Sequence, residues 1–151
     1  MNAIELLKSD HREAEGLMDQ IETADKGAAS SKALFNELKA ALTLHTQIEE
    51  QVFYPALRNH EETRDLIEES VREHDEVDQL LAEMTAMSLR DDEFMDKLIE
   101  LRESVSHHVE EEESEMFAKA EKILGRERLN QMGGEMMQMK QGRSRKATNP
   151  R

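Results

Sequence analysis

The segment LHTQIEEQVFYP, residues 44–55, combines polar groups with a helical apolar pattern. His45 and Glu49 are four residues apart, so an α-helix places both side chains on one face. Leu38 and Leu42 fall on the same face, which is typical of a stripe that packs against a protein core. An imidazole and a carboxylate that point into a core need a compensating partner, because burying such groups alone is costly.

The composition of the chain favours helices throughout. The 151 residues are enough for one domain with a core of its own. Only two prolines and six glycines interrupt the chain, and the aromatic residues that favour strands make up 3% of it. Apolar residues recur at steps of three and four along most of the sequence, so we predict an all-α fold.

An internal repeat relates the two halves of the chain. Adding 63 to a residue number maps His11 onto His74, His45 onto His108, Glu49 onto Glu112, Glu50 onto Glu113 and Glu15 onto Asp78. Each half therefore contributes one pair of helices, and each helix carries one histidine on its apolar stripe. Two such pairs predict an up-down-up-down four-helix bundle.

The organisation beyond the repeat follows from glycines and charge. Gly125 is expected to end the bundle, so the predicted bundle domain comprises residues 1–125. Residues 126–140 are rich in methionine and predict a short C-terminal fifth helix that packs on the bundle. Residues 141–151 are basic and are expected to form a flexible tail.

The four histidines and two glutamates predict a metal site. A single histidine on an apolar face is more often a hydrogen-bonded core residue than a ligand. Four such histidines, with two glutamates at equal offsets from them, would place several charged groups in the core. A polyvalent cation would compensate these charges. Imidazole and carboxylate without sulfur suit iron or manganese and tolerate zinc. The four histidines and two glutamates are more ligands than one zinc ion binds. They fit two irons, with Glu49 and Glu112 as bridging ligands. Ferritin-like sites place the glutamate before the histidine, and here the order is reversed in both halves.

Four segments, SDHRE, HTQIEEQVFYP, EHDEVD and HHVEEEESEMF, together resemble the hemerythrin-like family with its HHE cation-binding domain. The resemblance covers about residues 4–118. It implies a non-haem di-iron centre with an oxo or hydroxo bridge, in which His11 and His45 bind one iron and His74 and His108 the other. It further implies that Glu49 and Glu112 bridge the two. Members of this family bind O₂, act on NO or peroxide, or sense iron and oxygen.

Several positions depart from the oxygen-carrying members of that family. A further histidine would be expected four residues after His74, where this chain has Asp78. A spacing of five to Glu112 would select His107 as the ligand, whereas the repeat selects His108. Glu15 and Asp78 are candidate additional ligands or carboxylates that orient an imidazole. Tyr54 either packs at the bundle end or supplies a phenolate ligand.

Composition also bears on partners and location. The net charge of −14 argues against a nucleic-acid partner, since phosphate binding needs a basic surface. The chain has no cysteine, and its first residues contain no apolar run that indicates a signal peptide or membrane span, so we expect a cytoplasmic protein without membrane contact. Its oligomeric state cannot be predicted.

The predicted ligand is a small diatomic molecule or peroxide. Because a carboxylate at residue 78 would favour the ferric state, we expect redox or nitrosative chemistry rather than reversible O₂ carriage. The alternatives are an iron- or oxygen-responsive regulatory module and a peroxidase or catalase-like enzyme that uses the same centre.

Overall fold

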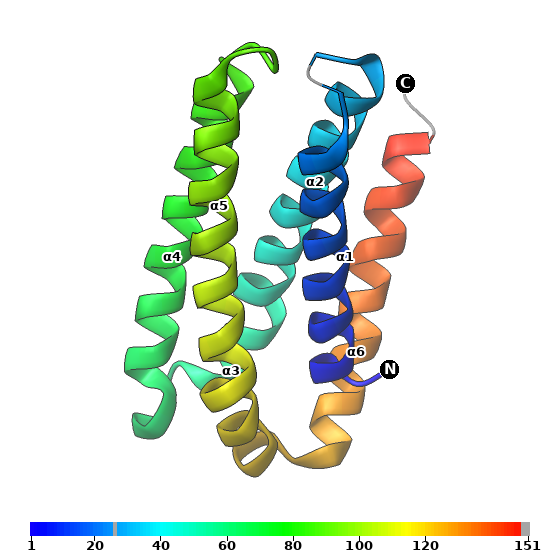
Figure 1. Ribbon diagram of the computed structural model, residues 1–151. Coiled ribbons are helices and arrows are strands. Elements are labelled where there is room, and N and C mark those ends of the chain that lie inside the picture. Colours follow the sequence, from blue (N-terminus) through cyan, green and yellow to red (C-terminus); the bar gives the residue numbers. More distant parts are fainter. Residues whose placement is uncertain (26, 149–151) are drawn as a thin grey trace.

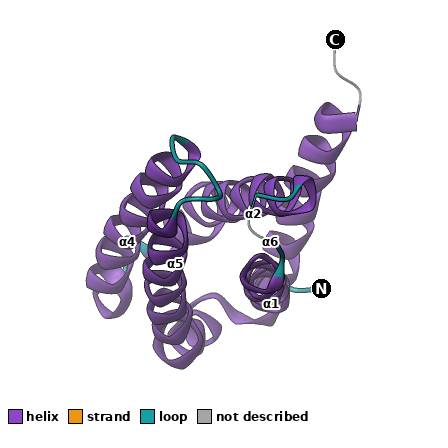
Figure 2. Ribbon diagram, turned by 45° about the horizontal axis from the view of Figure 1, so that its top comes forward, coloured by secondary structure: helices purple, strands orange, loops and turns teal. Residues whose placement is uncertain are grey.

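The computed structural model describes residues 1–25 and 27–148, with the backbone alone for residues 143–148. Within these residues the chain is helical and has no strand, which confirms the predicted all-α fold. Four long helices run alternately up and down side by side (Figures 1 and 2). They are α1 (Ala3–Thr23), α2 (Ala29–Ile48), α4 (Glu61–Thr85) and α5 (Asp92–Glu111). None of the described helices is both long enough and apolar enough to cross a membrane.

The start of α1 is fixed by a reciprocal pair of hydrogen bonds. The Asn2 side chain accepts from the backbone N–H of Glu5 at 2.9 Å, and the Glu5 carboxylate accepts from the Asn2 N–H at 2.9 Å. This capping box satisfies two N–H groups that a helix end leaves without partners. The turn between α1 and α2 contains Gly27 at φ +73°, a left-handed conformation that glycine adopts without strain.

A wide, π-helical turn follows each of the helices that carry an HxxxE pair. The turns are η1 (Glu49–Phe53), which leads into α3 (Tyr54–Leu57), and η2 (Glu112–Met116). Their bounds differ by 63 residues at both ends, so the sequence repeat is also a repeat of backbone geometry. Pro55 follows η1, whereas Ala118 holds the equivalent place after η2. The proline is therefore not the cause of the wide turn, and such turns occur frequently at functional sites.

The C-terminal helix α6 (Phe117–Thr148) bends at Gly125, whose φ of 76° and ψ of 167° are not helical. After the bend it runs beside α1 (Figure 1). Gly133 permits this approach, because a Cβ atom there would lie 2.3 Å from the carbonyl oxygen of Met1. Met132 and Met136 are buried, while Met137 is 38% exposed.

The C-terminal helix is longer than the sequence predicted. It continues to Thr148 instead of ending at residue 140. Lysine, glutamine, arginine and alanine, which dominate residues 140–147, are good helix formers, and no proline interrupts the segment before residue 150. The rest of the predicted flexible tail, residues 149–151, lies outside the described residues.

A polar layer divides the core into two apolar clusters. One cluster lies toward the loops that join α1 to α2 and α4 to α5, and it includes Met18, Leu38 and Leu101. The other lies toward the N-terminus and the wide turns, and it includes Leu7 and Met116. The buried histidines and glutamates of the repeat occupy the layer between them.

Candidate metal centre

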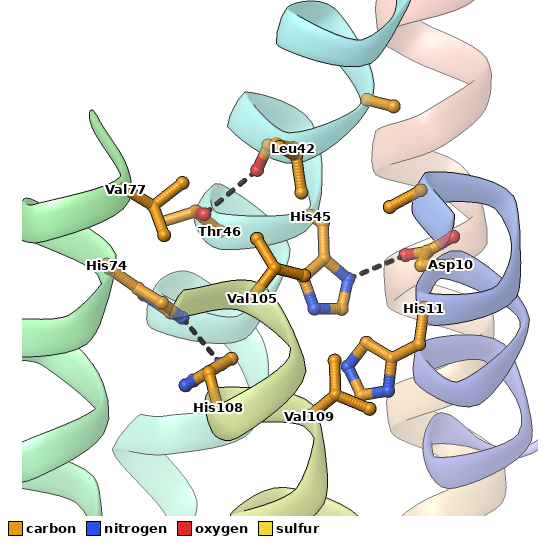
Figure 3. A pocket seen from close by; sticks show the side chains of 12 residues that line it. Asp10, His11, Leu42, His45, Thr46, His74, Val77, Val105, His108 and Val109 are labelled. Carbon is orange, nitrogen blue, oxygen red and sulfur yellow. Dashed lines mark hydrogen bonds and ion pairs between the residues drawn. The ribbon is translucent and has the colours of Figure 1, made fainter. Parts of the chain in front are cut away.

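Six buried side chains from the four bundle helices and the two wide turns meet in the polar layer. None is more than 7% exposed, and they are His11, His45, Glu49, His74, His108 and Glu112. Figure 3 shows the four imidazoles turned toward a common region between the helices. Nitrogen and oxygen atoms of these side chains form two groups in which all atoms lie within 4.8 Å of one another. One group is His11, His45, Glu49 and Glu112, and the other is Glu49, His74 and His108.

Each buried glutamate contacts at least one histidine of each pair. Glu49 Oε1 lies 3.2 Å from His45 Nε2 and 3.0 Å from His74 Nε2. In the second half of the repeat, Glu112 Oε1 lies 3.3 Å from His108 Nε2 and 3.0 Å from His11 Nε2. Both carboxylates thus lie between the His11/His45 pair and the His74/His108 pair and contact both pairs through Oε1.

The outer nitrogen of every imidazole contacts a carboxylate. His11 Nδ1 lies 2.7 Å from Glu113, His45 Nδ1 3.0 Å from Asp10, His74 Nδ1 2.7 Å from Glu50 and His108 Nδ1 2.8 Å from Glu73. A carboxylate can only accept, so each Nδ1 donates and each Nε2 is left to face the layer. This pairing is the usual way in which proteins orient imidazoles that bind metals.

The repeat could have revealed these four outer carboxylates. Asp10 directly precedes His11, and Glu73 directly precedes His74, which places the two acids 63 residues apart. Glu50 and Glu113 share that offset. The apolar stripe alone does not identify them, because all four lie at its edge.

Two buried atoms of the layer have no hydrogen-bond partner, namely His45 Nε2 and Glu49 Oε2. His45 Nε2 is close to Glu49 Oε1, but the angles do not allow a hydrogen bond between them. His74 Nε2 and His108 Nε2 face each other at 3.3 Å. Lone pairs that converge in this way fit a cation, so the residues present are suited to a metal site.

Without a metal, the charges around His45 and His108 favour protonation of these two rings. Burial of the His45 ring lowers its pKa, but the Glu49 charge and the Asp10 hydrogen bond outweigh this and raise the pKa to about 10. Burial likewise opposes protonation of His108, yet the Glu112 charge and hydrogen bond hold its pKa well above the ordinary value. Burial would raise the pKa of Glu49, whereas the His45 charge keeps it well below its ordinary range. The metal-free layer is therefore a set of buried ion pairs.

Tyr54 packs in the apolar cluster beside the wide turns, and its hydroxyl reaches the polar layer. Its hydroxyl donates to Glu112 Oε2 at 2.7 Å and lies 3.3 Å from His74 Nε2. Burial and the charges of Glu112 and Glu49 raise the pKa of this phenol well above 10.0. In a regular helix Tyr54 would fall one residue off the apolar stripe, and the wide turn η1 rotates it inward.

The other three candidates are not brought into the layer. His107 is 63% exposed and contacts Glu111 at 3.0 Å, because the neighbouring His108 takes the inward position. Glu15 is 41% exposed and pairs with Arg12 at 2.9 Å. Asp78 is exposed, and its short side chain does not reach the buried glutamates. Partial burial and the charges of Asp75 and Glu50 raise its pKa, against the opposing effect of His74.

A small cavity adjoins the four imidazoles. Its volume is about 30 Å³, and apolar groups line much of it, including Leu42, Val77, Val105 and Val109 (Figure 3). The Thr46 hydroxyl also lines it, but this group donates to the Leu42 carbonyl at 2.9 Å and is not free to bind a ligand. A space of this volume admits a molecule of a few atoms and excludes an organic substrate.

Comparison with known families agrees with this geometry. Residues 2–120 match the family described as the hemerythrin HHE cation binding domain. The chain therefore belongs to this family, as the four quoted segments implied.

The individual relatives are 27–29% identical to this chain. A crystal structure of a hemerythrin HHE cation binding domain-containing protein from Mycobacterium kansasii superposes with a TM-score of 0.86 at 27% identity, covering 98% of this chain and 91% of that one. A protein of Nostoc sp. named DNA nickase is 29% identical over 89% of this chain, and an uncharacterized hemerythrin-like protein of Schizosaccharomyces pombe is 29% identical over 78%. The chain spans 38% and 59% of the lengths of these two relatives.

Proposed function

We propose that the chain binds two iron ions in the polar layer and uses them to bind or transform O₂, NO or peroxide. His11 and His45 would hold one ion, His74 and His108 the other, and Glu49 and Glu112 would be shared. The observation that supports this assignment best is the double contact of each buried glutamate with one histidine of either pair. One metal ion would leave half of these buried groups uncompensated.

Residues of the chain would perform three tasks around the ions. The outer carboxylates hold the Nδ1 protons and so direct every Nε2 toward the layer. The Tyr54 hydroxyl fixes the orientation of the Glu112 carboxylate and offers a further oxygen ligand. The surrounding apolar clusters exclude bulk water. Bound iron would supply one-electron redox chemistry toward small ligands.

The cavity supports a ligand the size of O₂, NO or hydrogen peroxide, because about 30 Å³ leaves room for little more. Carboxylates other than Asp78 favour redox rather than storage chemistry. Asp78 is exposed, but four outer carboxylates surround the imidazoles and make them more basic. Such ligands stabilise ferric iron, so we favour a role in oxidative or nitrosative stress over reversible O₂ carriage.

Two alternatives are less well supported. A regulatory role in which a partner binds the methionine face of α6 is disfavoured, because Met132 and Met136 are already packed in the core. The name of the Nostoc relative raises a nucleic-acid role, but this chain spans 38% of that protein and carries a net charge of −14. We therefore maintain the prediction of no nucleic-acid binding, and a mobility-shift titration with DNA at low salt tests it.

The test of the proposed function is elemental analysis of protein expressed with excess iron, followed by optical spectra. We expect two irons per chain and a near-ultraviolet charge-transfer band that changes on addition of O₂, NO or hydrogen peroxide. One zinc per chain, or no metal, would contradict the proposal. Catalytic loss of hydrogen peroxide would identify the enzyme alternative, whereas a spectral change without turnover would identify a binding protein.

A further inference from the structure

The outer carboxylates of the two histidine pairs differ in what surrounds them. Those of the His11/His45 pair each contact a cation. Arg12 Nη2 lies 2.6 Å from Glu113 Oε1 and 2.7 Å from Oε2 of the same carboxylate. Lys140, from α6, donates to Asp10.

The equivalent carboxylates of the His74/His108 pair, Glu50 and Glu73, contact no lysine or arginine among the residues whose side chains the structure describes. The repeat places Asp75 where Arg12 stands in the first half. Glu73 instead lies beside further acids, since Glu69 and Glu111 form a group with it and with His107. His107 Nε2 is 3.5 Å from Glu73 and is shared with Glu111.

From this contrast, and resting on the proposed two-metal centre, we propose that Arg12 and Lys140 make the two metal positions unequal. A cation on an outer carboxylate withdraws charge from the imidazole that the carboxylate holds. The positive charge of Arg12 or Lys140 also repels a metal cation through the low-dielectric interior. The His74/His108 position therefore binds a dication more tightly and fills first, and the His11/His45 position fills second.

Two departures from the repeat produce this inequality. Lys140 belongs to α6, which has no counterpart in the two helix pairs and runs beside α1 (Figure 1). Arg12 and Asp75 are equivalent positions with opposite charges. Both are exposed, so exchanging their charges need not disturb the core.

The experiment is an anaerobic titration of the metal-free full chain with Co²⁺, followed by its visible absorption. His45→Ala leaves the His74/His108 position intact, and His108→Ala leaves the His11/His45 position intact. We expect the His45→Ala chain to bind Co²⁺ about tenfold more tightly than the His108→Ala chain, the scale on which outer partners act.

Charge variants then assign the cause. In the His108→Ala background, Arg12→Gln and Lys140→Gln should each tighten Co²⁺ binding by several-fold, whereas Lys8→Gln, an exposed control on the same helix, should not. In the His45→Ala background, Asp75→Arg should weaken binding, and His107→Gln should leave the order of the two positions unchanged.

The outcomes separate this inference from the proposed function. Equal affinities at the two positions, or weaker binding in Lys140→Gln and Arg12→Gln, would overturn the inequality and leave the two-metal centre standing. A wild-type chain that binds no Co²⁺ and no iron would overturn both. Circular dichroism of each variant, together with the opposite sign expected for Asp75→Arg, separates these effects from a general loss of folding.

Discussion

The two halves of the molecule share their backbone and most of their polar layer, yet they differ at one aromatic ring. Tyr54 follows η1 and stacks on His74 with ring centroids 5.5 Å apart, and Phe117 follows η2 and stacks on His11 at 6.1 Å. The two positions are related by the same offset of 63. Only Tyr54 brings a hydroxyl to the buried carboxylates. The halves are thus alike in the groups that would hold metal and unlike in the groups that would modify it.

The largest effect is expected at the shared glutamates, where the halves should behave alike. Glu49→Gln and Glu112→Gln should each cost most of both metals, because each carboxylate contacts both histidine pairs. Glu49→Gln should also destabilise the metal-free protein by about 3 kcal/mol, since it breaks buried ion pairs with His45 and His74. Elemental analysis and urea unfolding measure the two effects. Loss of a single metal would mean that the glutamates are not shared.

The histidines distinguish the halves from one another. His45→Ala and His108→Ala should each lose one of two irons or more, because each removes a ligand from a different position. His107→Ala should retain both irons, since its ring is exposed and faces Glu111. Iron content per chain after identical expression is the measurement. Loss of iron in His107→Ala with retention in His108→Ala would reverse the assignment of α5.

The pH dependence of the metal-free protein tests the ion pairs of the layer. The folded pKa of His45 is raised from 6.5 to about 10. Its contribution to stability is therefore complete below pH 6.5 and is lost as the pH rises toward 10. The Glu49 pKa is lowered, so its contribution is present above pH 4.5 and is lost at lower pH. The melting temperature of the metal-free chain should fall from pH 6.5 to pH 10, and His45→Gln should flatten that decline.

The smallest effect is expected from giving both halves the same aromatic ring after the wide turn. Tyr54→Phe removes the hydroxyl that donates to Glu112, which should cost about 1–3 kcal/mol in the metal-free protein. Iron content should stay near two per chain, and any visible phenolate-to-iron absorption should disappear. Phe117→Tyr is the matched variant in the other half. An unchanged unfolding free energy in Tyr54→Phe would show that the hydroxyl contributes nothing to the layer.

The repeat in the sequence was sufficient to predict the bundle and to identify the six side chains that meet in it. It could not place Tyr54, because the helical period that was applied has 3.6 residues per turn and η1 is wider. It also gave no information on Lys140, which reaches Asp10 only because Gly125 reverses the chain and Gly133 lets α6 approach the N-terminus. Contacts made by elements outside a repeat depend on packing that local patterns do not encode.

The polar layer between the two apolar clusters has a consequence for how the helices align along their axes. Leucine and methionine faces of a bundle can slide by one helical turn, about 5.4 Å, and still bury apolar surface. Here such a slide would set a histidine or glutamate of the layer against side chains such as Leu42 or Val105 and leave charged groups without partners. The layer therefore selects one axial alignment among several that the apolar residues alone would accept, so the groups proposed to bind metal also give the bundle a unique structure.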